Sequence, residues 1–197
     1  MSEQNRRLRA AGIAALAWAG LAAVWCVLVP GGAAELPQGV PGTLRSLLVL
    51  PLAEELVFRG IIAQTLLERY GTARAGVWKA CLVSGVLFGA AHLSNLLGSE
   101  AFGVLMQCVF AASLGVMLAA IYFRTGNLWV TVFLHSTMDI ASMLIGGLYG
   151  TTSVAESVSG YDASRLLSVA VYLIPTLFLL RKKKLPEVQL YLSLIHI

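Results

Sequence analysis

The sequence predicts an all-α protein, a polytopic bundle of about six transmembrane helices. Hydrophobic residues make up 58% of the chain and charged residues only 12%, whereas soluble domains average about 45–50% and about 25%. Apolar segments recur along the chain at close to the length of about 20 residues that a helix needs to cross a hydrocarbon core. The 19 glycines are spread among these segments, where small residues let helices approach closely in lipid.

These segments form a single domain, because 197 residues are too few for a second one. We expect that domain to cover residues 1–190, with its motif-bearing core at 43–148. The connections around 30–42 and 149–164 are rich in Gly, Ser, Thr and Pro and predict loops. The six spans are expected at residues 10–29, 43–66, 77–97, 102–124, 128–148 and 165–181.

Both ends of the chain allow a second interpretation. Basic residues precede the segment 10–29 and small residues follow it, as in a secretory signal peptide. Its apolar run is longer than the usual signal core of about 7–15 residues, so we expect a retained helix. Residues 191–197 are abruptly apolar again after a basic stretch. We interpret them as a non-native tail, which sets His196 aside.

The basic residues predict the topology. Of fourteen Lys and Arg residues, eleven fall on one side of the expected spans, two on the other, and Arg59 lies within a span. Positive charge stays cytoplasmic, so we expect both termini inside, in a prokaryotic plasma membrane. The net charge of +4 is therefore a topology signal and does not indicate a nucleic-acid partner. The expected partner of such a chain is membrane lipid.

The three cysteines, Cys26, Cys81 and Cys108, all fall within apolar segments. Their spacing is not that of a metal site, and it suggests no disulfide pair. We expect them to act as small packing residues.

The second expected span carries three charged residues near its middle, Glu54, Glu55 and Arg59. Each costs about 2.5–3.5 kcal/mol at the centre of a membrane helix, whereas a strongly apolar residue contributes only about −0.3 to −0.6 kcal/mol. The apolar residues of this span therefore roughly cancel the cost of its charges or leave insertion unfavourable. The charged side chains must find partners on other helices or face a wet cavity.

Helical spacing separates the roles of the two glutamates. Glu55 and Arg59 are four residues apart with the acid first, which favours an ion pair on one helix face. Glu54 points about 100° away and has no basic partner on its own helix. We expect Glu55 and Arg59 to form a structural pair and Glu54 to be a free carboxylate, available as a general base.

Two further spans carry histidines. Phe88 and His92 lie one helical turn apart, as do His135 and Asp139. Taken alone, each pair is more typical of a hydrogen bond between helices than of catalysis. A His/Asp pair at this spacing also orients an imidazole, binds a metal or polarises a carbonyl. The three polar motifs together predict one shared reactive site.

The three motifs resemble those of the CPBP family, which comprises CAAX prenyl endopeptidases of the Ras-converting type and bacteriocin-processing relatives, also called Abi proteins. That family carries EExxxR, FxxxH and HxxxN/D on successive membrane helices, and the resemblance covers about residues 50–140. The segment Thr125-Gly126-Asn127-Leu128-Trp129 and Gly60 are also typical of it. The motifs stand here as Glu54-Glu55-Leu56-Val57-Phe58-Arg59, Phe88-Gly89-Ala90-Ala91-His92 and His135-Ser136-Thr137-Met138-Asp139.

The resemblance implies intramembrane proteolysis, with a peptide or protein substrate as a further partner. Glu54 and His92 would activate a water molecule, while His135 and Asp139 would stabilise the oxyanion or complete the site. One proposed mechanism is a metalloprotease with zinc held by Glu54, His92 and His135, and the other is a metal-free glutamic protease. Many CAAX-cleaving members have Asn where this chain has Asp139. An ionised Asp cannot donate a hydrogen bond to an oxyanion, so Asp139 would have to be protonated, bind metal or hold His135, and the last two roles are favoured.

Two alternatives belong to other functional classes. Some family members act in self-immunity against bacteriocins, so a non-catalytic immunity or partner-binding factor is one of them. The other is a proton-linked carrier, because buried Glu and His chains also relay protons. The sequence does not name a substrate, and it does not indicate whether a substrate would be prenylated.

Overall fold

The structure, a computed structural model, describes residues 40–149, 154–186 and 188. Every regular element among these residues is helical, which confirms the all-α prediction. The expected span at 10–29, Cys26 and the tail at 191–197 lie outside the described residues.

The expected second span is one continuous helical run. It begins as α2 (Val40–Glu55), continues as the π-helix η2 (Leu56–Ala63) and ends as α3 (Gln64–Tyr70). Gly71, with a positive φ of 77°, ends the run. The π-helix was not expected from the sequence, and it begins directly after Glu55. Single π-turns inside α-helices are frequent at functional sites.

The next three expected spans form with boundaries close to those predicted. α4 (Arg74–Ala91) tightens into the 3₁₀ helix η3 (His92–Leu97), and α5 (Ala101–Thr125) follows after a short turn. α5 ends at Gly126, whose left-handed φ of 62° is a common helix stop. α6 (Leu128–Tyr149) begins after Asn127, whose side-chain oxygen accepts a hydrogen bond from the Trp129 amide at 2.9 Å and caps the helix.

The prediction of a plain loop at 149–164 was wrong in part. The segment contains the short helix α7 (Val154–Ser159), which lies against the start of α5. Val158 is fully buried, and a Cβ atom at Gly103 would collide with its carbonyl oxygen. The Ser159 hydroxyl also accepts a hydrogen bond from the Glu100 amide at 3.0 Å. These contacts come from distant residues, so local composition did not reveal the helix.

The chain then forms its last apolar helix. Asp162 accepts a hydrogen bond from the Ser164 amide at 2.8 Å and begins the 3₁₀ turn η4 (Ala163–Arg165). Hydrogen bonds from the Ser164 side chain and from its backbone amide keep the pKa of Asp162 below its usual value. η4 leads into α8 (Leu166–Leu179), and the 3₁₀ turn η5 (Lys182–Lys184) follows.

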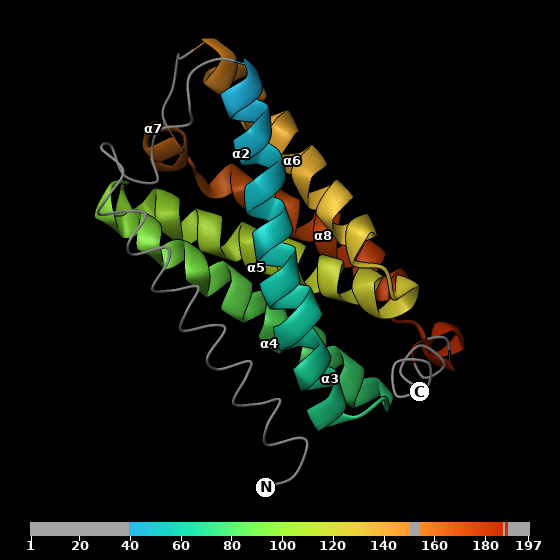
Figure 1. The fold of residues 1–197 in the computed structure, drawn as a ribbon. Coiled ribbons are helices and arrows are strands. Elements are labelled where there is room, and N and C mark those ends of the chain that lie inside the picture. The colour runs from blue at the N-terminus through green and yellow to red at the C-terminus, as the bar shows by residue number, and fades with distance from the viewer. Residues whose placement is uncertain (1–39, 150–153, 187, 189–197) are drawn as a thin grey trace, which may run out of the picture.

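α5 is the central helix of the bundle. It packs against α4 and α8, while α2 packs along α6 (Figure 1). Glycines set the closest approach between α4 and α5. A Cβ atom at Gly85 would collide with the backbone of Ala112, and one at Gly89 would collide with the carbonyl of Cys108. This close contact holds the end of α4 that carries Phe88 and His92 against α5.

Apolar side chains cover the outside of the bundle, and the charged motif residues lie within it. Glu55 and Arg59 are fully buried. Two described helical runs are long and apolar enough to cross a membrane: Arg74–Leu97 with mean hydropathy 1.6 and Ala101–Thr125 with 2.2. The protein is therefore an all-α helical membrane protein, and the count of six spans stays a prediction. Exposed large apolar residues include Val86, Leu97, Phe102, Trp129, Phe133, Leu167 and Phe178.

Candidate active site

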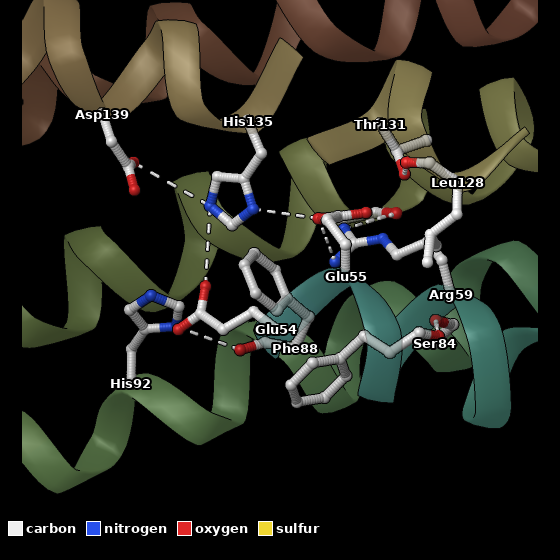
Figure 2. Close-up of polar contacts among 12 residues, drawn as sticks. Glu54, Glu55, Arg59, Ser84, Phe88, His92, Leu128, Thr131, His135 and Asp139 are labelled. Carbon is white, nitrogen blue, oxygen red and sulfur yellow. Dashed lines mark hydrogen bonds and ion pairs between the residues drawn. The ribbon is translucent and has the colours of Figure 1, made fainter. Parts of the chain in front are cut away.

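The structure brings the three predicted motifs together in one polar cluster. The side chains come from α2 and η2, from the junction of α4 and η3, and from α6 (Figure 2). Helices that are distant in sequence therefore meet at the charged residues, as the cost of a lone charge in lipid requires. The cluster contains all seven residues singled out from the sequence: Glu54, Glu55, Arg59, Phe88, His92, His135 and Asp139.

Glu55 and Arg59 form the ion pair that their spacing predicts. Arg59 Nη1 lies 2.9 Å from Glu55 Oε1, and both side chains are fully buried. Arg59 Nη2 also donates to the carbonyl oxygen of Gly115 on α5 at 3.4 Å. The guanidinium group lies 4.5 Å from the centroid of the Phe88 ring, a favourable cation–π distance. Arg59 thus joins η2 to α4 and α5.

Glu55 has a second partner that the sequence did not reveal. His135 Nδ1 donates a hydrogen bond to Glu55 Oε1 at 2.9 Å, across 80 residues of chain. This bond fixes the orientation of the imidazole and directs its Nε2 atom away from Glu55. Glu55 therefore does more than neutralise Arg59, because it also positions His135.

Two carboxylates lie near the free edge of His135. Glu54 Oε2 is 3.6 Å from His135 Nε2, and Asp139 Oδ1 is 3.8 Å from the same atom. Both distances exceed those of a direct hydrogen bond. The Glu54 and Asp139 side chains retain 15% and 26% exposure, whereas Glu55 retains none. The open side of the cluster is thus the side that carries Glu54, Asp139 and His135 Nε2.

Phe88 holds both imidazole rings. Its ring contacts His92 and His135 edge to face, with centroids 5.1 and 5.5 Å away. Its carbonyl oxygen accepts a hydrogen bond from His92 Nδ1 at 3.0 Å. In neutral His92 the proton is therefore on Nδ1 and the Nε2 lone pair is free. The one-turn spacing of Phe88 and His92 thus sets both the position and the tautomer of the histidine.

Glu54 points toward the region between the two histidines (Figure 2). Its carboxylate lies 3.6 Å from His135 Nε2. The joint activation of water by Glu54 and His92, which the resemblance implies, stays a prediction. Arg59 pairs with Glu55 rather than with Glu54. Glu54 is thus not paired with the arginine of its own helix, as helical spacing predicts.

A buried serine supports the π-helix and was missed by the sequence interpretation. The Ser84 hydroxyl on α4 donates to the Phe58 carbonyl oxygen at 3.2 Å. A serine in an apolar helix is too common to signal this role. The bond helps to hold the irregular turn that separates Glu55 from the rest of its helix.

The site contains the residue types that bind zinc, namely imidazole and carboxylate. However, among the residues that the structure describes, no group of three or more His, Cys, Asp or Glu side chains is arranged to hold a metal ion. The arrangement therefore lacks a formed ligand set. Zinc binding by Glu54, His92 and His135 stays a prediction.

Comparison with known proteins identifies the family. The family model for type II CAAX prenyl endopeptidase Rce1-like proteins matches residues 36–141, which is more than half of the chain and includes the whole polar cluster. The chain belongs to the Rce1-like family. This result confirms the resemblance that the three motifs indicated.

One curated relative of this Rce1-like chain bears the name "Putative membrane peptidase YdiL" and comes from Bacillus subtilis (strain 168). The two are 32% identical over 106 residues, which cover 53% of this chain and 37% of the relative. The match thus spans well under half of the relative's length. No solved structure matches the chain significantly.

Proposed function

We propose that this Rce1-like protein is an intramembrane endopeptidase that hydrolyses peptide bonds with a water molecule activated by Glu54 and His92. The observation that carries the proposal is the set of groups around His135 Nε2. Glu54 and Asp139 lie 3.6 and 3.8 Å from this atom, at the open side of an otherwise apolar bundle. Membership of a peptidase family supports the same reaction.

Glu54 is the general base of the proposed reaction. Its carboxylate takes a proton from water while the water oxygen attacks the carbonyl carbon of the substrate. His92 Nε2 accepts the second hydrogen bond of that water, because Nδ1 is engaged by the Phe88 carbonyl. Glu54 then passes its proton to the leaving nitrogen as the C–N bond breaks. Positioned acid–base groups of this kind contribute about 10²–10⁴-fold to a rate.

His135 supplies the hydrogen bond to the oxyanion. Its Nδ1–H is held by Glu55, so a protonated ring presents a second N–H at Nε2 on the open side. The carboxylates of Glu54, Glu55 and Asp139 surround the ring and favour its positive charge. Asp139 thereby stabilises the charged form of His135 and does not have to donate a hydrogen bond to the oxyanion. Oxyanion donors typically contribute about 10²–10³-fold to turnover.

We also propose that both termini are cytoplasmic and that the membrane is a prokaryotic plasma membrane. The support is the distribution of basic residues. Arg69, Arg74 and Arg124 lie at the ends of described helices on the side predicted to be inside, as does the segment Arg181–Lys184. Positive charge at these ends is typical of cytoplasmic connections.

The direct test uses purified protein and a library of fluorogenic peptides, with and without a prenyl group. Turnover should fall by at least about a hundredfold in Glu54→Gln. Glu100→Gln is the matched control, because this exposed glutamate lies in the turn before α5 and away from the cluster. A folded wild-type protein that cleaves no peptide would overturn the proposal and favour a non-catalytic immunity or partner-binding role.

A further inference from the structure

Asn95 and Gln107 form a polar pair close to His92 that the proposed reaction does not use. Asn95 Nδ2 donates to Gln107 Oε1 at 2.7 Å. Gln107 is 6% exposed and lies in α5, one of the two described runs that can cross a membrane. A buried amide is costly in such a helix unless it is hydrogen-bonded, so the pair needs a structural or functional reason.

The fold places this pair beside the polar cluster. A 3₁₀ helix has three residues per turn and rises about 2 Å per residue. Asn95 therefore lies on the same face of η3 as His92, about 6 Å further along the helix axis. On α5, Gln107 lies one turn before Ala111, which packs in a buried cluster with Phe58 and Phe88. Both amides thus lie next to the groups that hold His92.

The hydrogen bond between the two amides fixes what they offer to a ligand. It uses one N–H of Asn95 and the oxygen of Gln107. The Asn95 oxygen remains an acceptor and the Gln107 nitrogen remains a donor. Neither atom makes another hydrogen bond within the described part of the chain. One acceptor beside one donor complements the N–H and C=O groups of a peptide backbone.

A substrate of this reaction has to present such groups. A peptide bond within a membrane helix must be unwound before water can attack it, and unwinding frees backbone N–H and C=O groups. Those groups are costly in an apolar setting unless they find new partners. An extended chain advances about 3.3 Å per residue, so 6 Å corresponds to about two residues.

We infer that Asn95 and Gln107 form a backbone clamp that binds an unwound substrate segment about two residues from the scissile bond. The clamp accepts a hydrogen bond from a substrate N–H and donates one to a substrate C=O. It therefore selects extended peptide segments largely independently of their side chains. This inference rests on the proposed peptidase function and adds to it the form in which the substrate is bound.

The test is an N-methyl scan of a peptide that the wild-type protein cleaves. Methylation of one backbone amide at a time removes one N–H. We expect one position near the scissile bond to raise KM by about tenfold, the effect of losing one neutral hydrogen bond, with little change in kcat. In Asn95→Leu, KM for the unmethylated peptide should already be raised, and methylation at that position should add nothing.

Such non-additivity identifies a direct contact, which a purely structural role of Asn95 would not produce. Ser94→Ala is the matched control, because Ser94 is exposed on the same helix and bonds only to the Ala91 carbonyl among the described residues. If Asn95→Leu does not fold, Gln107→Met removes the partner that orients Asn95 and should abolish the same position-specific effect.

If methylation raised KM equally in wild type and in Asn95→Leu, the inferred clamp would be wrong. It would also be wrong if methylation lowered kcat alone. A different result would contradict the proposed function. If Glu54→Gln cleaved the unmethylated peptide as fast as wild type, the reaction assigned to the cluster would be wrong, whatever the scan showed.

Discussion

Glu55 accepts a hydrogen bond from His135 through the same oxygen that pairs with Arg59. The two distances, from Glu55 Oε1 to His135 Nδ1 and to Arg59 Nη1, are both 2.9 Å. One buried carboxylate oxygen therefore joins η2 to α6 and neutralises a buried arginine. Glu54, the adjacent residue, lies 3.6 Å from the other ring nitrogen of His135, beyond direct hydrogen-bond distance, so the neighbouring glutamates should respond differently to substitution.

Glu55→Ala should reduce folded yield and thermal stability, whereas Glu54→Gln should leave both nearly unchanged. Removing one partner of a buried ion pair typically costs about 3–5 kcal/mol, because the other charge is left without compensation. The measurement is the unfolding temperature of both variants in detergent. Equal stability of the two, with only Glu55→Ala inactive, would reverse the roles assigned to the glutamates.

His92→Ala and His135→Ala should each reduce turnover by at least about a hundredfold, the usual contribution of an acid–base or oxyanion group. If both act with Glu54 on one reacting peptide, combining either substitution with Glu54→Gln should add little further loss. Single-turnover rates of the single and double variants test this. Losses that multiply would argue against a shared centre.

Asp139→Asn should reduce turnover, because it removes one of the carboxylates that favour a charged His135. Under the metal-free mechanism, added zinc should not restore the activity. If Asp139 instead braces a zinc-bound His135, metal affinity should fall about 10–100-fold and zinc should restore activity in part. The decisive comparison is the rate of both proteins with and without a chelator. Full wild-type activity after exhaustive chelation, with bound metal shown absent, would establish the glutamic mechanism.

Single cysteines introduced at Gly39 and Ser157 should react with an impermeant reagent from outside the cell. Both positions belong to connections that the distribution of basic residues places outside. A cysteine at Arg124, at the end of α5, serves as the inside control. Labelling of Gly39→Cys or Ser157→Cys only from the cytoplasmic side would contradict the six-span topology.

The sequence by itself determined the features that depend on neighbouring residues. Within the described part of the chain, hydrophobic composition predicted the long helices and their boundaries to within a few residues. The four-residue spacings of Glu55 with Arg59 and of Phe88 with His92 predicted contacts that the structure contains. These contacts lie within one helical turn, so helical geometry alone sets them. The motifs also identified the family.

Only the tertiary structure decided the contacts between helices. The bond from His135 to Glu55 and the pairing of Asn95 with Gln107 depend on how α2, α4, α5 and α6 pack. The π-helix after Glu55 and the short helix α7 depend on distant partners, Ser84 and Gly103, which no local pattern reveals. The sequence therefore supplies the charged groups, and packing decides which of them support the site and which are free to react.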